Sequence, residues 1–173
     1  MKRNRERYLT LPIRITGGPL RGGTFNLNAI PDALPAMAVI GCYASGTTKL
    51  VNVPQARIKE TDRIAVMCAE LRLLGADIKE LPDGLVIQGS LGLEGASGGT
   101  DGKPVRTHSD GKAGHKRAAG CITVDGHGDH RVVMALAVAA LGIRGTVCIQ
   151  GSEAVEVTFP GFFKLLNHAL GRA

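Results

Sequence analysis

The sequence predicts an α/β (α+β) fold in which a strand–helix–strand–helix unit occurs twice. Three observations lead to this prediction. Hydrophobic residues make up 44% and charged residues 21% of the 173 residues, a balance that supports a packed core and excludes wholesale disorder. Strand-like and helix-like segments alternate along the chain, and one series of such segments is repeated. Aromatic residues are only 3%, so we expect aliphatic side chains to fill the core.

The first unit begins with short strands that surround an apolar helix. Leu11–Thr16 and Thr24–Asn28 are predicted as strands, because turns rich in glycine and proline separate them. Asp32 precedes residues 33–44, which are apolar almost all round, and a helix of this kind is normally buried on every side. Thr47–Val53 is predicted as the next strand.

A second helix and a hairpin complete this unit. Residues 62–74 keep a helical spacing of apolar side chains, with Thr61 or its neighbour as the N-cap and Gly75 as a left-handed C-cap. Residues 76–81 and 85–88 flank the turn Pro82-Asp83-Gly84, which is the strongest hairpin signal in the chain. The first predicted unit therefore spans residues 11–89.

Residues 90–120 interrupt this pattern, because they are rich in glycine and nearly free of apolar side chains. We expect a flexible surface insertion there.

The second predicted unit, residues 121–173, repeats the first. The segment 25–32 is echoed 97 residues later by the segment 122–129, and Met37-Ala38-Val39 matches Met134-Ala135-Leu136 at the same offset. A glycine, a strand and a further helix follow each of these helices, the last helix covering 160–170. Chance similarity of two segments with alternating strands and helices is the alternative explanation.

The net charge is +6, and basic residues crowd the start of the chain. Such an excess of positive charge can indicate nucleic-acid binding. The sequence, however, shows neither aromatic residues interleaved with the basic ones nor the pattern of a known nucleic-acid-binding domain. A small acidic substrate would explain basic residues equally well. No apolar run is long enough for a membrane span and no leader pattern opens the sequence, so we expect a cytoplasmic protein.

The cysteines are Cys42, Cys68, Cys121 and Cys148, and no two of them form a CxxC pair. Three lie in apolar stretches. We expect buried, reduced thiols rather than metal ligands or a disulfide.

Polar clusters lie at the starts of three predicted helices: 31–32, 59–63 and 128–131. Helix N-termini favour anions. Arg63 and Arg131 oppose the helix dipole there, so each is expected to have an anionic partner, either a ligand or a structural carboxylate of Asp62 or Asp129.

Asp32 and Glu60 are the candidates for proton transfer, which requires two carboxylates in different environments. From its position alone, however, Asp32 is better explained as an ordinary N-cap. His130 would either assist proton transfer or brace Asp129.

Four motifs, in this order, resemble those of the EPSP synthase (3-phosphoshikimate 1-carboxyvinyltransferase) family. They are Pro31-Asp32, the segment 57–64 (RIKETDRI) with its helix ending at Gly75-Ala76, the segment 129–131 (DHR) followed by Met134-Ala135, and the segment 158–162 (TFPGF). The resemblance implies an enolpyruvyl transferase fold of repeated βαβαββ units, of which about two, with buried apolar helices, are present here.

The resemblance covers only the last third of the family enzyme. It therefore implies a single C-terminal-lobe fragment, which we expect to be inactive alone. Its implied partners are phosphoenolpyruvate, shikimate 3-phosphate and the missing N-terminal lobe, supplied as a separate chain or a removed segment. The resemblance implies neither a metal nor an organic cofactor. It also implies no binding to nucleic acid or to a membrane.

The resemblance also implies roles for individual residues. Asp32 would accept the proton of the shikimate 5-hydroxyl and contact that ring. Gln55 would bind the shikimate phosphate, and Lys59 would lie near both substrates. Glu60 would protonate the enolpyruvyl methylene carbon.

Arg63 and Arg131 would bind phosphoenolpyruvate, with His130 as their neighbour in the cleft. One departure concerns Val157, because the family usually has a lysine two residues before the Phe-Pro of its last motif.

Alternatives remain open from the sequence, both within this class of enzyme and outside it. One is a fragment similar to UDP-N-acetylglucosamine enolpyruvyl transferase, which shares the fold. The other is a non-catalytic domain of related architecture that binds anions or RNA, or that assembles with a partner through its basic arm Lys2–Arg7.

Overall fold

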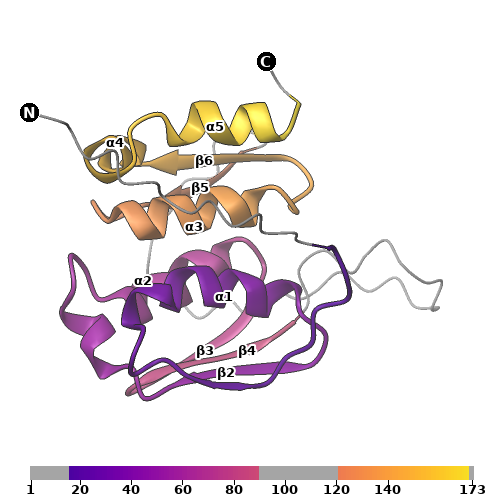
Figure 1. Cartoon of the computed structure of the whole chain (residues 1–173), viewed down its shortest axis with the longest axis vertical. Coiled ribbons are helices and arrows are strands. Elements are labelled where there is room, and N and C mark those ends of the chain that lie inside the picture. The colour runs from indigo at the N-terminus through magenta and orange to yellow at the C-terminus, as the bar shows by residue number, and fades with distance from the viewer. Residues whose placement is uncertain (1–15, 90–120, 172–173) are drawn as a thin grey trace, which may run out of the picture.

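The computed structural model describes residues 16–89 and 121–171 as two sheets with helices between them (Figure 1). A four-stranded sheet forms one end of the molecule, and a two-stranded sheet lies toward the other end. Helices α1 (Leu34–Tyr43), α2 (Arg63–Leu73) and α3 (His130–Ala140) lie between the sheets. The insertion 90–120 and the predicted strand Leu11–Thr16, apart from its last residue, lie outside the described residues.

The first sheet consists of β1 (Thr24–Asn26), β2 (Thr47–Val51), β3 (Asp77–Leu81) and β4 (Gly84–Gln88), in the order β1-β2-β4-β3. Strands β1 and β2 are parallel, whereas β4 is antiparallel to both β2 and β3. The predicted hairpin is therefore confirmed. Strand β2 ends two residues earlier than predicted, because Asn52 adopts a positive φ of 57° and its N–H donates to the Asp83 carboxylate.

Helix α1 follows a 3₁₀ turn, η1, over Pro31–Ala33. Six of its ten residues are buried, as its apolar sequence predicts. The expectation of burial on every side is wrong, however, because Ile40 is 45% exposed. Val138 in α3 is also 45% exposed. Both helices therefore retain an apolar strip that no element of the described chain covers.

Helix α2 follows a second 3₁₀ segment, η2 (Pro54–Ile58), and begins at a capping residue. Asp62, the neighbour of Thr61, is its N-cap, and its Oδ1 accepts hydrogen bonds from the backbone N–H groups of Ile64 and Ala65. Arg57 holds the other oxygen of this carboxylate at 2.8 Å.

The second unit repeats the order β–α–β. Strands β5 (Cys121–Asp125) and β6 (Thr146–Gln150) are parallel neighbours joined through α3, as β1 and β2 are joined through α1. The 3₁₀ turn η3 (Ser152–Ala154), the short helix α4 (Val155–Thr158) and α5 (Phe162–Ala169) follow β6. Helix α5 lies at the end of the molecule away from the four-stranded sheet (Figure 1).

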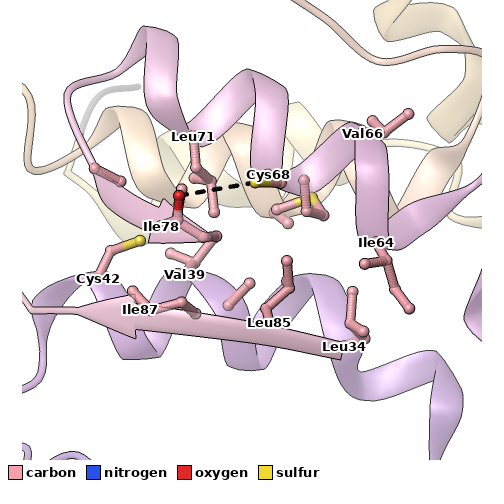
Figure 2. Close-up of a cluster of buried hydrophobic side chains, with 14 of the residues drawn as sticks. Leu34, Val39, Cys42, Ile64, Val66, Cys68, Leu71, Ile78, Leu85 and Ile87 are labelled. Atoms are coloured by element: carbon pink, nitrogen blue, oxygen red, sulfur yellow. Dashed lines mark hydrogen bonds between the residues drawn. The ribbon is translucent and has the colours of Figure 1, made fainter. Parts of the chain in front are cut away.

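The core is aliphatic, as the composition predicts, and it continues from the first unit into the second. Figure 2 shows side chains of α1 and α2 meeting those of β3 and β4, among them Val39, Leu71 and Ile87. Helices α1 and α2 both pack on α3. The Tyr43 hydroxyl of α1 donates to the Ala139 carbonyl of α3 at 2.5 Å, which ties the two units together.

Two of the four cysteines behave as predicted. Cys42 and Cys68 are free and buried, and burial raises the pKa of the Cys42 thiol to about 12. The prediction is wrong for Cys121 and Cys148, which form a disulfide. The pairing of β5 with β6 places Cys148 opposite Thr123, so that the two cysteines become diagonal neighbours with Cα atoms 6.4 Å apart. Sequence spacing alone does not indicate this approach.

No helix in the described part of the chain is long and apolar enough to cross a bilayer.

Truncation of Leu136 tests the core that the two units share. Leu136 in α3 is fully buried, so Leu136→Ala removes apolar burial and leaves a cavity. The free energy of unfolding should fall by about 2–5 kcal/mol, measured by urea denaturation. Val138→Ala, on the exposed strip of the same helix, should change it by no more than about 0.5 kcal/mol. Equal losses for both variants would contradict the shared core.

Candidate active site

Charged side chains from three helix starts converge at one place in the structure. Asp32 comes from η1. Lys59 and Glu60 lie between η2 and α2, and Arg63 is the first residue of α2. Asp129 and Arg131 come from the start of α3. Residues up to 99 positions apart in the sequence are thereby brought together.

The centre of this cluster is a buried ion pair between the two units. Arg63 Nε donates to Asp129 Oδ2 at 2.7 Å, and Arg63 Nη2 donates to Asp129 Oδ1 at 3.3 Å. Their side chains are 1% and 0% exposed. Asp129 is also the N-cap of α3, because its Oδ1 accepts the backbone N–H of Arg131 at 2.8 Å. One carboxylate therefore caps a helix and neutralises a buried guanidinium.

Arg63 also holds the two candidate proton-transfer groups. Its Nη1 donates to Asp32 Oδ1 at 2.8 Å, and its Nη2 donates to Glu60 Oε2 at 2.7 Å. Four of the five guanidinium N–H bonds are thus directed at carboxylates. The alternative that Asp32 is an N-cap is wrong: η1 has Ile30 as its N-cap residue and no side-chain cap.

The exposed rim of the cluster carries weaker contacts. Lys59 Nζ lies 3.4 Å from Asp32 Oδ1, and Arg131 Nη2 lies 3.3 Å from Asp32 Oδ2. Three cationic side chains face three carboxylates, so the cluster is electrically balanced. An incoming anion would therefore compete with Asp32 for Lys59 and Arg131, the two cations with the longest contacts.

These contacts set the acidity of Asp32. Desolvation acts to raise its pKa, but the hydrogen bond from Arg63 and the charges of Arg131 and Lys59 outweigh it, and the pKa of Asp32 lies below its ordinary value. Desolvation likewise acts to lower the pKa of Arg63, and the Asp129 partner reverses this effect. Both shifts favour the charged forms of Asp32 and Arg63.

A second polar contact fixes the loop that carries Asp129. Glu70 of α2 is buried, and its Oε2 accepts the backbone N–H of Asp125 at 3.0 Å. Its Oε1 lies 2.8 Å from Nε2 of His127, a residue with a positive φ of 50°. The sequence analysis did not predict this role of Glu70. The available signal was a glutamate three residues after Met67, a member of the apolar stripe of this helix.

The other predicted site residues lie outside the ion-pair network in the described structure. Gln55 Nε2 donates to the backbone and side-chain oxygens of Asn28, at 3.0 and 3.1 Å, beside an open hollow lined by Asn26, Asn28, Asn52 and Pro54. His130 is the first residue of α3 and is half-buried. Val157 is 85% exposed on α4.

Comparison with known proteins identifies the family. The profile of EPSP synthase (3-phosphoshikimate 1-carboxyvinyltransferase) matches residues 10–166. The chain belongs to the EPSP synthase family. It is 51% identical over 155 residues to the 3-phosphoshikimate 1-carboxyvinyltransferase of Acetivibrio thermocellus and 48% identical over 160 residues to that of Ruminiclostridium cellulolyticum.

These matches cover most of this chain but a minor part of each relative. They include 90% of this chain and 30% of the Acetivibrio thermocellus protein, and 92% and 32% for the second relative. A crystal structure of EPSP synthase from Acinetobacter baumannii superposes with a TM-score of 0.64 and 30% identity, covering 87% of this chain and 30% of that chain. The predicted α/β fold class is therefore confirmed, and the chain spans about a third of the length of its relatives.

Removal of the Asp129 carboxylate should strongly destabilise this member of the EPSP synthase family. Asp129→Ala leaves a buried guanidinium without its principal partner and removes the cap of α3, so the free energy of unfolding should fall by about 3–5 kcal/mol. Urea denaturation at neutral pH measures this change. Glu153→Ala, which removes an exposed carboxylate, is the matched control and should have little effect. A small loss for Asp129→Ala would show that the pair does not hold the units together.

The low pKa of Asp32 predicts a pH dependence of stability. The folded-state pKa of Asp32 lies below its ordinary value of 3.8, so the unfolded chain binds a proton first as the pH falls. The contribution of Asp32 is therefore present above about pH 4 and is lost as the pH falls through the folded-state pKa. The difference in unfolding free energy between the unmodified chain and Asp32→Asn should narrow from pH 7 to pH 3. A difference independent of pH would contradict the ion pairs of Asp32.

Proposed function

We propose that the chain is the C-terminal part of a 3-phosphoshikimate 1-carboxyvinyltransferase of aromatic amino acid biosynthesis. The reaction transfers the enolpyruvyl group of phosphoenolpyruvate to the 5-hydroxyl of shikimate 3-phosphate and releases phosphate. The observation that carries this proposal is the convergence of Asp32, Glu60 and three cationic side chains in a family member. Both substrates are anionic, and the cations at the rim suit them.

The first step is addition of the 5-hydroxyl oxygen to C2 of phosphoenolpyruvate, with Asp32 accepting the hydroxyl proton. Asp32 alone is a weak base, because Lys59 and Arg131 stabilise its charged form. Substrate anions that draw these two cations away would raise the pKa of Asp32. Binding of phosphoenolpyruvate would thus make Asp32 a stronger base in the complex that reacts.

Glu60 supplies the proton to the methylene carbon in the same step. It is about half exposed, with one oxygen held by Arg63 Nη2 at 2.7 Å, so its orientation is fixed while its other oxygen remains accessible. Loss of phosphate and of a proton from that carbon then restores the double bond. Lys59 and Arg131 would stabilise the departing phosphate.

Arg63 is proposed to act chiefly by orienting Asp32 and Glu60, since four of its five N–H bonds already face carboxylates. Arg131 remains the exposed group for binding phosphoenolpyruvate, with His130 beside it in sequence. Gln55, held by Asn28, is proposed to bind the phosphate of shikimate 3-phosphate.

The proposed site is open to solvent on one side. Asp32, Glu60 and Arg131 are each more than 40% exposed, so water competes for each of these three charges. We propose that residues 1–173 form one part of the enzyme, with two repeat units, and that a further lobe closes the site and excludes water. Residues 1–173 alone should therefore not catalyse the reaction.

A chimera tests this function directly. The chain replaces the matching third of the Acetivibrio thermocellus enzyme, and phosphate release from phosphoenolpyruvate is measured with and without shikimate 3-phosphate. The chimera should release phosphate only when both substrates are present, whereas the chain alone should not. Glu60→Gln in the chimera should lower kcat by about 10²–10⁴-fold, and Arg131→Ala should raise the KM for phosphoenolpyruvate.

Glu153→Gln, an exposed carboxylate outside the cluster, serves as the matched control and should leave both constants unchanged. If the chimera folds but adding shikimate 3-phosphate does not cause phosphate release, the proposed function is refuted.

A further inference from the structure

Arg57, near the end of η2, makes polar contacts that join two parts of the first unit. Its Nε donates to the Pro82 carbonyl at 2.8 Å, and its Nη2 donates to the Leu81 carbonyl at 2.7 Å. Nη2 also lies 2.8 Å from Glu80 Oε1. These partners belong to the end of β3 and the turn that follows it. The guanidinium is thereby fixed to the β3–β4 hairpin.

A further contact of Arg57 closes a short segment of the chain. Its Nη1 donates to Asp62 Oδ2 at 2.8 Å, across five positions of sequence. The segment between the two partners, residues 58–61, includes Lys59 and Glu60, which are both members of the charged cluster. The Arg57–Asp62 ion pair therefore bridges the two ends of the segment that carries the proposed proton donor.

Burial does little to hold segment 58–61 in place. Ile58 is 84% exposed, and the side chain of Glu60 is 47% exposed. The contact of Glu60 with Arg63 fixes one carboxylate oxygen, but it does not fix the backbone that carries this side chain. The ends of the segment are anchored by contrast, because Arg57 is attached to the hairpin and Asp62 caps α2. A segment with so few buried contacts takes its conformation from its anchored ends.

We propose that Arg57 is a positioning residue of the active site. Its bridge to Asp62 holds segment 58–61, and thereby Glu60, in the orientation from which Glu60 protonates the methylene carbon. Arg57 acts through Glu60 and contacts no substrate itself, because its donors are engaged by the hairpin and by Asp62. The effect on catalysis rests on the proposed function, whereas the restraint on the segment follows from these contacts alone.

An arginine suits this task for a geometric reason. Its planar guanidinium presents donors in fixed directions, so one side chain can bind a carboxylate and two carbonyls at the same time. A lysine has one ammonium group and cannot fix the same three directions. Reaction rates are sensitive to such restraints, because a misplacement of about 1 Å far from the chemistry can lower a rate by about 10²-fold.

The first experiment measures how readily segment 58–61 opens in the folded chain. Trypsin cleavage after Lys59 is followed by mass spectrometry under native conditions. Arg57→Gln removes the bridge, so this cleavage should become about tenfold faster. Asp62→Asn should have the same effect, because asparagine retains the cap of α2 but offers no charge to Arg57.

Arg72→Gln is the matched control. Arg72 Nε donates to the Ile78 carbonyl of β3 at 2.9 Å, so this arginine also holds the hairpin, but from the C-terminal end of α2. Its loss should leave the rate of cleavage after Lys59 unchanged, and urea denaturation of each variant accounts for any general loss of stability. Equal cleavage rates in Arg57→Gln, Asp62→Asn and the unmodified chain would overturn the proposal, whatever the activity.

The second experiment measures kinetics in the chimera. Arg57→Gln should lower kcat by about 10–100-fold. The KM for phosphoenolpyruvate should change much less, because Arg131 comes from α3 in the other unit. In the Glu60→Gln background, Arg57→Gln should lower kcat no further, whereas a merely structural loss would lower it in both backgrounds. Arg72→Gln should leave kcat unchanged.

Failure of the proposed function and failure of the positioning role give different results. If the chimera is inactive but Arg57→Gln accelerates cleavage after Lys59, the proposed function fails and the restraint on segment 58–61 stands. If the chimera is active and Arg57→Gln leaves kcat unchanged, the positioning role is overturned. Equal losses of kcat with and without Glu60→Gln would overturn it as well.

Discussion

The ion pair between Arg63 and Asp129 is the interaction on which the rest of this structure depends. It joins a helix start in the first unit to a helix start in the second, and both side chains are buried. A buried guanidinium is tolerated only if its charge and its donors are satisfied. Asp129 satisfies two donors, and the remaining contacts draw in Asp32 and Glu60. The requirement to neutralise one buried cation thus positions the whole charged cluster.

This arrangement has a consequence for reactivity. The carboxylates that would transfer protons are the same groups that stabilise Arg63, and Asp32 is additionally stabilised by Lys59 and Arg131. In the isolated chain these contacts lower the pKa of Asp32, which makes it a weak base. Under the proposed mechanism, substrate anions that compete for Lys59 and Arg131 would raise that pKa. A balanced cluster of this kind is suited to act when a charged ligand and a second protein surface close over it.

Incomplete burial of apolar side chains on helices of both units has a parallel explanation. Ile40, Val138 and Leu165 are exposed although each lies in a helix whose other apolar residues are packed or clustered. Exposed apolar strips on neighbouring helices are typical of surfaces that contact another part of a protein. The contrast is greatest between α5, which has no buried residue, and α2, which packs on β3 and β4.

The sequence by itself determined the elements and the family, because these depend on local spacing. Alternating apolar residues, the Pro82-Asp83-Gly84 turn and the four motifs predicted the strands, the hairpin and the fold class. It also singled out Asp32, Lys59, Glu60, Arg63 and Arg131, which the structure brings together. The assignment of catalytic and binding roles to these residues stays a prediction.

Only the tertiary structure decided which partner each charged or reactive group takes. Asp32 binds Arg63 instead of capping a helix, Glu70 reaches the loop of the other unit, and Cys121 meets Cys148 across two strands. These pairings join residues 27 to 55 positions apart in the sequence. Periodicity reports which face of an element is buried, but it carries no information on which distant element covers that face, because that depends on how the units pack.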